Sequence, residues 1–251
     1  MRPAARPRVP MMPALAPVLA LCRVSNLPTV WMNVLTAALL CGWPLATPQG
    51  AAPVLLLMVS LSCFYCGGMA LNDLCDRTHD ALHQPFRPIP AGRIGIRQAW
   101  GTTFLLFGLA LAALLAMPSA AGLGAGIALL AVICAYDYLH KAHAASVLLM
   151  ACARLLVYVV TAAALTGTVA EPVWLAASVQ AAYVLALTAV ARGEHRMPGG
   201  RYRWPVVPWL IALMPLVDGA LAAWWAGLPW LAAGVLGTVL TRLGQRRVRG
   251  D

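Results

Sequence analysis

The chain has 251 residues, of which 61% are hydrophobic and 10% are charged, and its mean hydropathy is +0.78. Eighteen Lys and Arg residues against eight Asp and Glu residues give a formal net charge of +10. A soluble core cannot hide this much apolar surface with so few charges to solvate it, and disordered chains are apolar-poor and rich in charge. The sequence therefore predicts an all-α, polytopic transmembrane helical bundle.

Eight apolar runs approach or reach the roughly 20 residues that a helix needs to cross a bilayer. In chain order they are residues 27–45, 53–71, 98–116, 120–135, 145–165, 173–191, 205–225 and 228–241. About eight spans are therefore expected within a transmembrane domain of residues 23–243. Residues 1–22 are expected to be a disordered or interfacial N-terminal segment, and residues 244–251 a basic cytoplasmic tail.

Basic residues gather in the segments that this arrangement places on one side of the membrane. Seventeen of the eighteen Lys and Arg residues precede the first run, follow the last, or lie in three alternate connections. By the positive-inside rule both termini and these connections are cytoplasmic, in the cell's inner (plasma) membrane. The basic excess therefore reflects membrane topology, and no nucleic-acid partner is expected.

The scarce acidic residues cluster after the second run, where residues 71–80 read LNDLCDRTHD. Asp73, Asp76 and Asp80 are spaced so that a helix continuing from the second run places them on one face. Grouped carboxylates without thiolate or imidazole favour Mg²⁺, which commonly bridges carboxylates to substrate phosphates. The alternative is a solvated helix in which an aspartate pairs with Arg77.

A rigid turn follows the acids, because residues 87–93 read RPIPAGR. The turn brings guanidinium groups back toward the carboxylates, and arginine suits bidentate contacts with phosphate. A diphosphate held between Mg²⁺ and Arg87 is the expected ligand. The alternative is that Arg87 and Arg93 serve only as cytoplasmic topology signals.

These motifs closely resemble those of the UbiA superfamily of intramembrane prenyltransferases. The acidic motif with its Arg-Pro turn carries most of the resemblance. Two further patterns agree with it: RVSNLPTVWMN at residues 23–33, and YDYLHK at residues 136–141. The pairing of YDxxHK with TxxxRxE, the latter at residues 188–194, is most similar to the divergent EboC-like branch.

The resemblance implies a helical bundle with a central, lipid-accessible cavity that binds a prenyl diphosphate through Mg²⁺. Ionisation then yields an allylic cation that alkylates a small aromatic or hydroxylated acceptor. By the same resemblance, Asn72, Asp73, Asp76 and Asp80 form the catalytic metal and diphosphate site, at the cytoplasmic side. Diphosphate contacts are expected from Arg87 and Lys141, and also from Asn33 on the pocket wall. The acceptor and prenyl pocket is expected to include Tyr136, Asp137, His140 and Tyr183.

The second acidic motif of the family, expected after the sixth run, is degenerate in this chain. Residues 180–194 keep Tyr183, Arg192 and Glu194, but the expected aspartates are replaced by Gln180 and apolar residues. One Mg²⁺ with Arg192 as the second cation, or rearranged metal ligands from Glu194 and Asp137, would each preserve catalysis. The alternatives to a transferase are a UbiA-type terpene cyclase and a non-catalytic transporter or lipid-binding scaffold.

Two charges lie inside predicted spans. Arg154 is the one basic residue within a run, and Asp218 lies at a similar depth in the seventh run. Arg154 is therefore expected either to contact the diphosphate or to form an intramembrane ion pair with Asp218.

Overall fold

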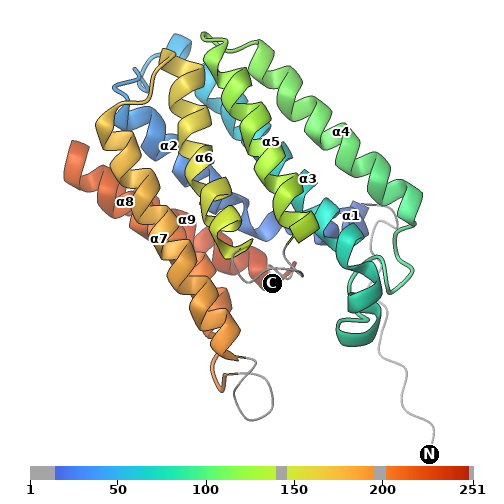
Figure 1. The fold of residues 1–251 in the computed structure, drawn as a ribbon. Coiled ribbons are helices and arrows are strands. Elements are labelled where there is room, and N and C mark those ends of the chain that lie inside the picture. The colour runs from blue at the N-terminus through green and yellow to red at the C-terminus, as the bar shows by residue number, and fades with distance from the viewer. Residues whose placement is uncertain (1–14, 140–145, 195–201, 249–251) are drawn as a thin grey trace, which may run out of the picture.

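The computed structural model describes residues 15–139, 146–194 and 202–248, and within them the chain forms nine α-helices, one short 3-10 helix and no strand. The α-helices are α1 (Leu15–Leu21), α2 (Leu27–Leu40), α3 (Pro48–His83), α4 (Ile96–Leu115), α5 (Ala121–Leu139), α6 (Ser146–Thr166), α7 (Glu171–Glu194), α8 (Val206–Ala226) and α9 (Pro229–Gln245). The prediction of an all-helical bundle is confirmed (Figure 1).

Within the described part of the chain, six helices, α3 to α8, are long and apolar enough to cross a membrane. A seventh span results only if α1 and the segment Val24–Leu40 are counted together, although they are bent by 57°. α2 has 14 residues and α9 has 17, so each is shorter than a full span. Each of the eight predicted runs therefore contains a helix, but two of these helices are short.

α2 is the central helix of the bundle and packs against α3, α6, α7, α8 and α9 (Figure 1). Pro28 lies in its first turn, where the missing backbone N–H costs no helical hydrogen bond. Most of α2 is buried, apart from the face that carries Trp31, and the buried residues include the polar side chains of Thr29, Asn33 and Thr36. Buried polar groups need partners, so these side chains must bond to neighbouring helices.

α3 extends well beyond the apolar layer. Thr47 caps its start, with its Oγ1 accepting a hydrogen bond from the Gly50 N–H. Its 36 residues are roughly 54 Å long at 1.5 Å per residue, whereas the hydrocarbon core is roughly 30 Å thick. The acidic segment therefore lies in the last turns of α3, at the same end of the bundle as the last residues of α5 and α7 (Figure 1).

α8 and α9 approach so closely that their contact requires glycine. A Cβ atom on Gly234 would lie 2.7 Å from the Pro215 carbonyl oxygen and 2.9 Å from the Cα of Gly219. Both neighbours are backbone atoms, so they cannot move aside without separating the helices. This contact holds α8 in place, and α8 carries Asp218 and Met214 toward the middle of the bundle.

The Gly234→Ala variant is therefore expected to unfold at a lower temperature in detergent, with a loss of about 1–3 kcal/mol in unfolding free energy. Gly108→Ala in α4 is the matched control, because a Cβ there meets no atom within 4 Å. Alanine favours helix over glycine, so the control should melt at the same or a higher temperature. A wild-type melting temperature for Gly234→Ala would contradict the close packing of α8 and α9.

Candidate active site

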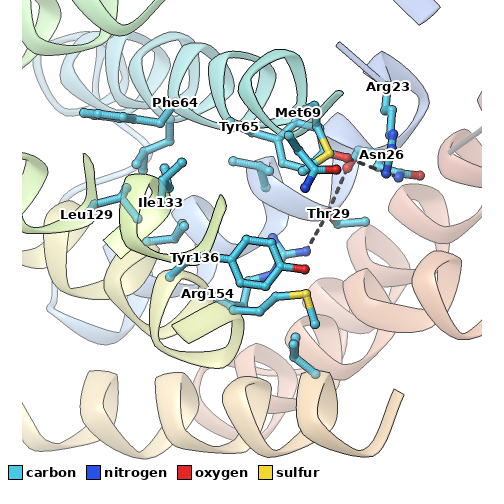
Figure 2. A pocket seen from close by; sticks show the side chains of 18 of the residues that line it. Arg23, Asn26, Thr29, Phe64, Tyr65, Met69, Leu129, Ile133, Tyr136 and Arg154 are labelled. Carbon is cyan, nitrogen blue, oxygen red and sulfur yellow. Dashed lines mark hydrogen bonds between the residues drawn. The ribbon is translucent and has the colours of Figure 1, made fainter. Parts of the chain in front are cut away.

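A cavity of about 300 Å³ lies among α2, α3, α5, α6, α7 and α8. Figure 2 shows Arg23 and Asn26 on one side of it and Phe64, Leu129 and Ile133 on the other. The polar lining comes from Arg23, Asn26, Thr29, Asn72, Asp137 and Arg154, together with the hydroxyl-bearing rings of Tyr65 and Tyr136. A mostly apolar cavity with a few convergent polar groups is typical of a small-molecule site.

The acidic segment at the end of α3 is divided between two neighbours. Asn72 faces the cavity, and its Nδ2 donates a hydrogen bond of 3.1 Å to Oδ1 of Asp137 on α5. Asp73 and Asp80 are 2% exposed and are held by arginines instead. Asp76 is half-buried. The three carboxylates expected to gather around one ion therefore do not all point to the same place.

An arginine cluster holds the carboxylates of Asp73 and Asp80. Arg87, from the turn after α3, contacts Oδ1 of Asp73 at 3.3 Å and Oδ2 of Asp80 at 2.7 Å. Arg23 contacts the same oxygen of Asp73 at 3.1 Å. Arg23 has a φ of +45°, a left-handed conformation that is strained for a residue with a side chain and that occurs where the chain bends between α1 and α2. This bend directs the Arg23 side chain to α3 and to the cavity lining.

Charged groups of both signs surround Tyr136 at the mouth of the cavity. Asp137 and Asp76 lie within electrostatic range of its hydroxyl, and so do Arg23 and Arg192. Four elements supply these groups: the α1–α2 bend, α3, α5 and the last turn of α7. The structure thus brings Arg192 to the same end of the cavity as the acidic segment.

Arg154 lines the cavity from α6 and is linked to Asp218 through an amide. Its guanidinium donates 2.7 Å and 3.0 Å hydrogen bonds to Oδ1 of Asn33 and Oγ1 of Thr29. Nδ2 of Asn33 donates in turn to Oδ2 of Asp218, at 2.6 Å. Among the described residues no ion pair joins Arg154 to Asp218 directly, so the predicted pair is replaced by a bridged one.

The Asp218 carboxylate is completely buried and receives two more hydrogen bonds. The Tyr158 hydroxyl donates to Oδ1, and Nε2 of Gln180 donates to Oδ2 at 3.0 Å. Asn33 is also fully buried, so it stands behind Arg154 instead of lining the cavity wall as predicted. The side chains of α2, α6, α7 and α8 therefore meet in one polar network inside the apolar bundle.

The other predicted site residues have separate positions. Glu194 ends α7, where its Oε1 accepts a 3.1 Å hydrogen bond from the Tyr202 N–H, and no described contact brings it to the other acids. The Tyr183 hydroxyl donates to the Leu210 carbonyl at 2.7 Å. Contrary to the prediction, Tyr183 is not one of the residues that line the cavity. His140 and Lys141 lie outside the described residues.

The cavity mouth offers the ligand types that Mg²⁺ prefers. Asn72 supplies an amide oxygen, and Asp76 and Asp137 supply carboxylates, all of them hard oxygen donors. Within the described residues no three His, Cys, Asp or Glu side chains are grouped closely enough to hold a metal alone. This donor set fits one Mg²⁺ that completes its octahedron with water and substrate phosphate. The α7 residues that line the cavity, Val184 and Leu187, offer no metal ligand.

Sequence reasoning did not predict that three polar residues in or beside the cavity hold its buried charges. Tyr158 and Gln180 hold Asp218, and Thr29 holds Arg154. The signal available was their position: each is a polar side chain within an apolar run, where an unpaired group would be costly.

Comparison with known proteins identifies the family and similar structures. The sequence model of the UbiA prenyltransferase family matches residues 30–251. A digeranylgeranylglyceryl phosphate synthase structure superposes with a TM-score of 0.62 at 15% identity, covering 94% of this chain and 95% of that one. A UbiA homologue from Archaeoglobus fulgidus bound to DMAPP and Mg²⁺ gives a TM-score of 0.58 at 20% identity, over 90% of this chain and 84% of that one.

Curated relatives match over shorter segments. Chloroplastic chlorophyll synthase of Arabidopsis thaliana is 36% identical over 92 residues, which are 35% of this chain and 23% of that protein. Digeranylgeranylglyceryl phosphate synthase of Methanoculleus marisnigri is 36% identical over 86 residues, 33% of this chain and 31% of that protein. The matched segments thus span less than a third of either relative's length.

Proposed function

Because the chain belongs to the UbiA prenyltransferase family, we propose that it transfers an isoprenoid group from a prenyl diphosphate to a small aromatic or hydroxylated acceptor. The observation that carries this proposal is the cavity itself. Its mouth combines oxygen donors with arginines, and its interior combines apolar side chains with aromatic rings. A prenyl diphosphate is divided in the same way, into a head with several negative charges and an apolar tail.

Asn72, Asp76 and Asp137 would hold one Mg²⁺ at the cavity mouth. Bound there, Mg²⁺ supplies charge that stabilises the diphosphate leaving group. Arg23 and Arg192 lie at the same mouth and would stabilise the negative charge that develops on the diphosphate oxygens. We propose the same role for Lys141. Asp73 and Asp80 act by holding Arg23 and Arg87 in place.

The interior of the cavity suits the isoprenoid chain and the cation formed from it. Leu61, Phe64, Leu129 and Ile133 provide an apolar wall that excludes water from a reactive carbocation. Tyr65, whose hydroxyl accepts a 3.2 Å hydrogen bond from Nδ2 of Asn26, is fixed with its ring at the cavity lining. The faces of Tyr65 and Tyr136 are suited to stabilise positive charge on the allylic group.

The proposed reaction takes place at the cytoplasmic side of a plasma membrane. Arg77 lies in the last turns of α3, Arg87 in the turn that follows it and Arg192 in the last turn of α7, and an excess of positive charge is typical of the cytoplasmic side. A prenyl diphosphate made in the cytoplasm reaches this mouth with its tail in the lipid and its head in water.

The test uses the full chain in lipid nanodiscs with dimethylallyl, geranyl, farnesyl and geranylgeranyl diphosphates, each with Mg²⁺ or with EDTA. Diphosphate release is expected with Mg²⁺ only, together with a product whose mass is acceptor plus prenyl group when membrane and cytosolic extracts are added. Asp76→Asn should lower release by about a hundredfold or more, since it removes a charged ligand of the leaving-group site.

The control is Glu171→Gln, which removes one carboxylate from an exposed position at the other end of α7. This variant should release diphosphate at the wild-type rate. Release of hydrocarbon or alcohol without any acceptor product would favour cyclisation instead. Wild-type protein that binds the diphosphates and never releases diphosphate would contradict the enzyme and favour a binding or transport role.

A further inference from the structure

The guanidinium of Arg154 is a cation in the interior of the bundle whose described partners are all neutral. They are the Asn33 amide oxygen, the Thr29 hydroxyl and the Met214 sulfur, the last at 3.2 Å. Inside a protein a charge is stable only when it is paired or well hydrogen-bonded. Arg154 also lines the cavity, so a bound molecule can reach it.

Arg154 lies deeper in the bundle than the acidic mouth. It follows the first residue of α6 by eight positions, roughly 12 Å of helix, whereas Asp137 lies two residues from the end of α5. In the cavity lining Arg154 has Ala153 and Val157 beside it on α6, and it contacts Thr29 and Met214. Among the described residues that line the cavity the one carboxylate is Asp137, near the end of α5, so an anion that reaches Arg154 meets its guanidinium directly.

The network behind Arg154 holds its guanidinium in one orientation. Thr29 is fixed because its Oγ1 donates a 2.8 Å hydrogen bond to the Asn26 carbonyl. Asn33 cannot rotate its amide without losing Asp218 on one side and Arg154 on the other. Asp218 balances the charge through the amide, but it leaves the cavity-facing edge of the guanidinium without a carboxylate.

We propose that Arg154 is a metal-independent oxyanion-binding subsite in the inner cavity, positioned by Asn33 and Asp218. It would take an anionic oxygen group of a substrate, either the donor diphosphate or an acidic group on the acceptor. Arginine forms short, directional hydrogen bonds to both. The substrate classes follow from the proposed function, but the subsite itself is argued from the contacts of Arg154.

The test is equilibrium binding to the full chain in nanodiscs, without turnover. The probes are geranyl diphosphate and geraniol, and 4-hydroxybenzoate and 4-hydroxybenzyl alcohol, so that each anion has a neutral counterpart. Each is measured in Mg²⁺ and in EDTA. Arg154→Gln is expected to weaken at least one anionic probe by about tenfold or more in EDTA, the factor of one charge-assisted hydrogen bond. The neutral probes should keep their affinities.

The two sources of the anion are separated by which probe is weakened. Loss of geranyl diphosphate affinity assigns the subsite to the donor, and loss of 4-hydroxybenzoate affinity assigns it to the acceptor. The matched control is Arg242→Gln, because Arg242 stacks on Trp209 at 4.2 Å and does not line the cavity. Wild-type affinities for both anions in Arg154→Gln, or no binding of either anion to the wild type, would overturn the proposal.

A second variant keeps the proposal testable if Arg154→Gln does not fold. In Asn33→Asp/Asp218→Asn the two ends of the bridge are exchanged, so a carboxylate contacts Arg154 directly and the total charge is unchanged. The carboxylate at position 33 then neutralises the positive charge of Arg154, and the affinity for the same anionic probe should fall about tenfold. Unchanged affinity in this variant also overturns the proposal. Because no diphosphate release is measured, failure here is distinguishable from failure of the proposed reaction.

Discussion

Replacing Arg87 by methionine is expected to lower the free energy of unfolding by about 3 kcal/mol, the cost of leaving a buried ionised group without its partner. Arg87 is the cation closest to the Asp80 carboxylate, at 2.7 Å, and it also contacts Asp73. Asp73 keeps Arg23, but within the described residues the one cationic contact left to Asp80 is His79 at 4.0 Å. The measurement is thermal unfolding in detergent, followed by the loss of soluble monomer.

Removing the second charge should restore much of this loss. In Arg87→Met/Asp80→Asn no ionised carboxylate is left at position 80, so the double variant is expected to melt above Arg87→Met alone. Arg93→Met is the matched control, because Arg93 comes from the same turn and its side chain is exposed. A double variant no more stable than Arg87→Met would show that Arg87 and Asp80 do not stabilise the protein as a pair.

The angular position of the acidic residues was predictable, but their partners were not. At about 100° per residue, Asn72, Asp73, Asp76 and Asp80 fall within about 100° of arc on one side of α3. An arc this wide faces more than one neighbour. Asn72, at one edge, meets α5 through Asp137, and Asp73, at the other edge, meets Arg23 and Arg87. The spacing alone cannot tell where one neighbour ends and the next begins.

The helical runs were predictable because apolar length is a local property of the sequence. The bend at Arg23 and the shortness of α2 and α9 were harder to predict, because they depend on how the helices pack. α2 is short and packs against five other helices, so its buried polar residues face those helices. Asn33 therefore lies between Arg154 and Asp218, which the sequence did not predict.

The degenerate motif on α7 also has a structural explanation that the sequence did not supply. Gln180 stands where an aspartate was expected, and its amide donates to a carboxylate that comes from α8. An aspartate at position 180 would face Asp218 and repel it. The acid in this region, Asp218, is therefore buried. It balances the charge of Arg154 through Asn33 and does not line the cavity.

Replacing Asp218 by leucine is expected to lower the free energy of unfolding by about 3 kcal/mol or more. Three donors each lose a hydrogen bond at once: the Tyr158 hydroxyl, Nδ2 of Asn33 and Nε2 of Gln180. Arg154 loses the negative charge that balances it through the amide. The measurement is again thermal unfolding in detergent, and the control is Thr241→Val, which removes a fully buried hydroxyl of α9 bonded only within its own helix. The control should cost about 1 kcal/mol.

The exchange variant, Asn33→Asp/Asp218→Asn, separates this structural role from the binding role of Arg154. The carboxylate introduced at position 33 accepts from Arg154. At position 218 the amide oxygen replaces Oδ1 and accepts from Tyr158, and the amide nitrogen replaces Oδ2 and donates to position 33. Nε2 of Gln180 loses this acceptor but keeps the Met214 carbonyl, and the number of charges in the network is unchanged. We expect the exchange to melt well above Asp218→Leu. If the exchange variant is as unstable as Asp218→Leu, folding requires the amide of Asn33 to lie between the charges of Arg154 and Asp218. If it is stable, its anion affinity reports directly whether Arg154 must face the cavity without a carboxylate of its own.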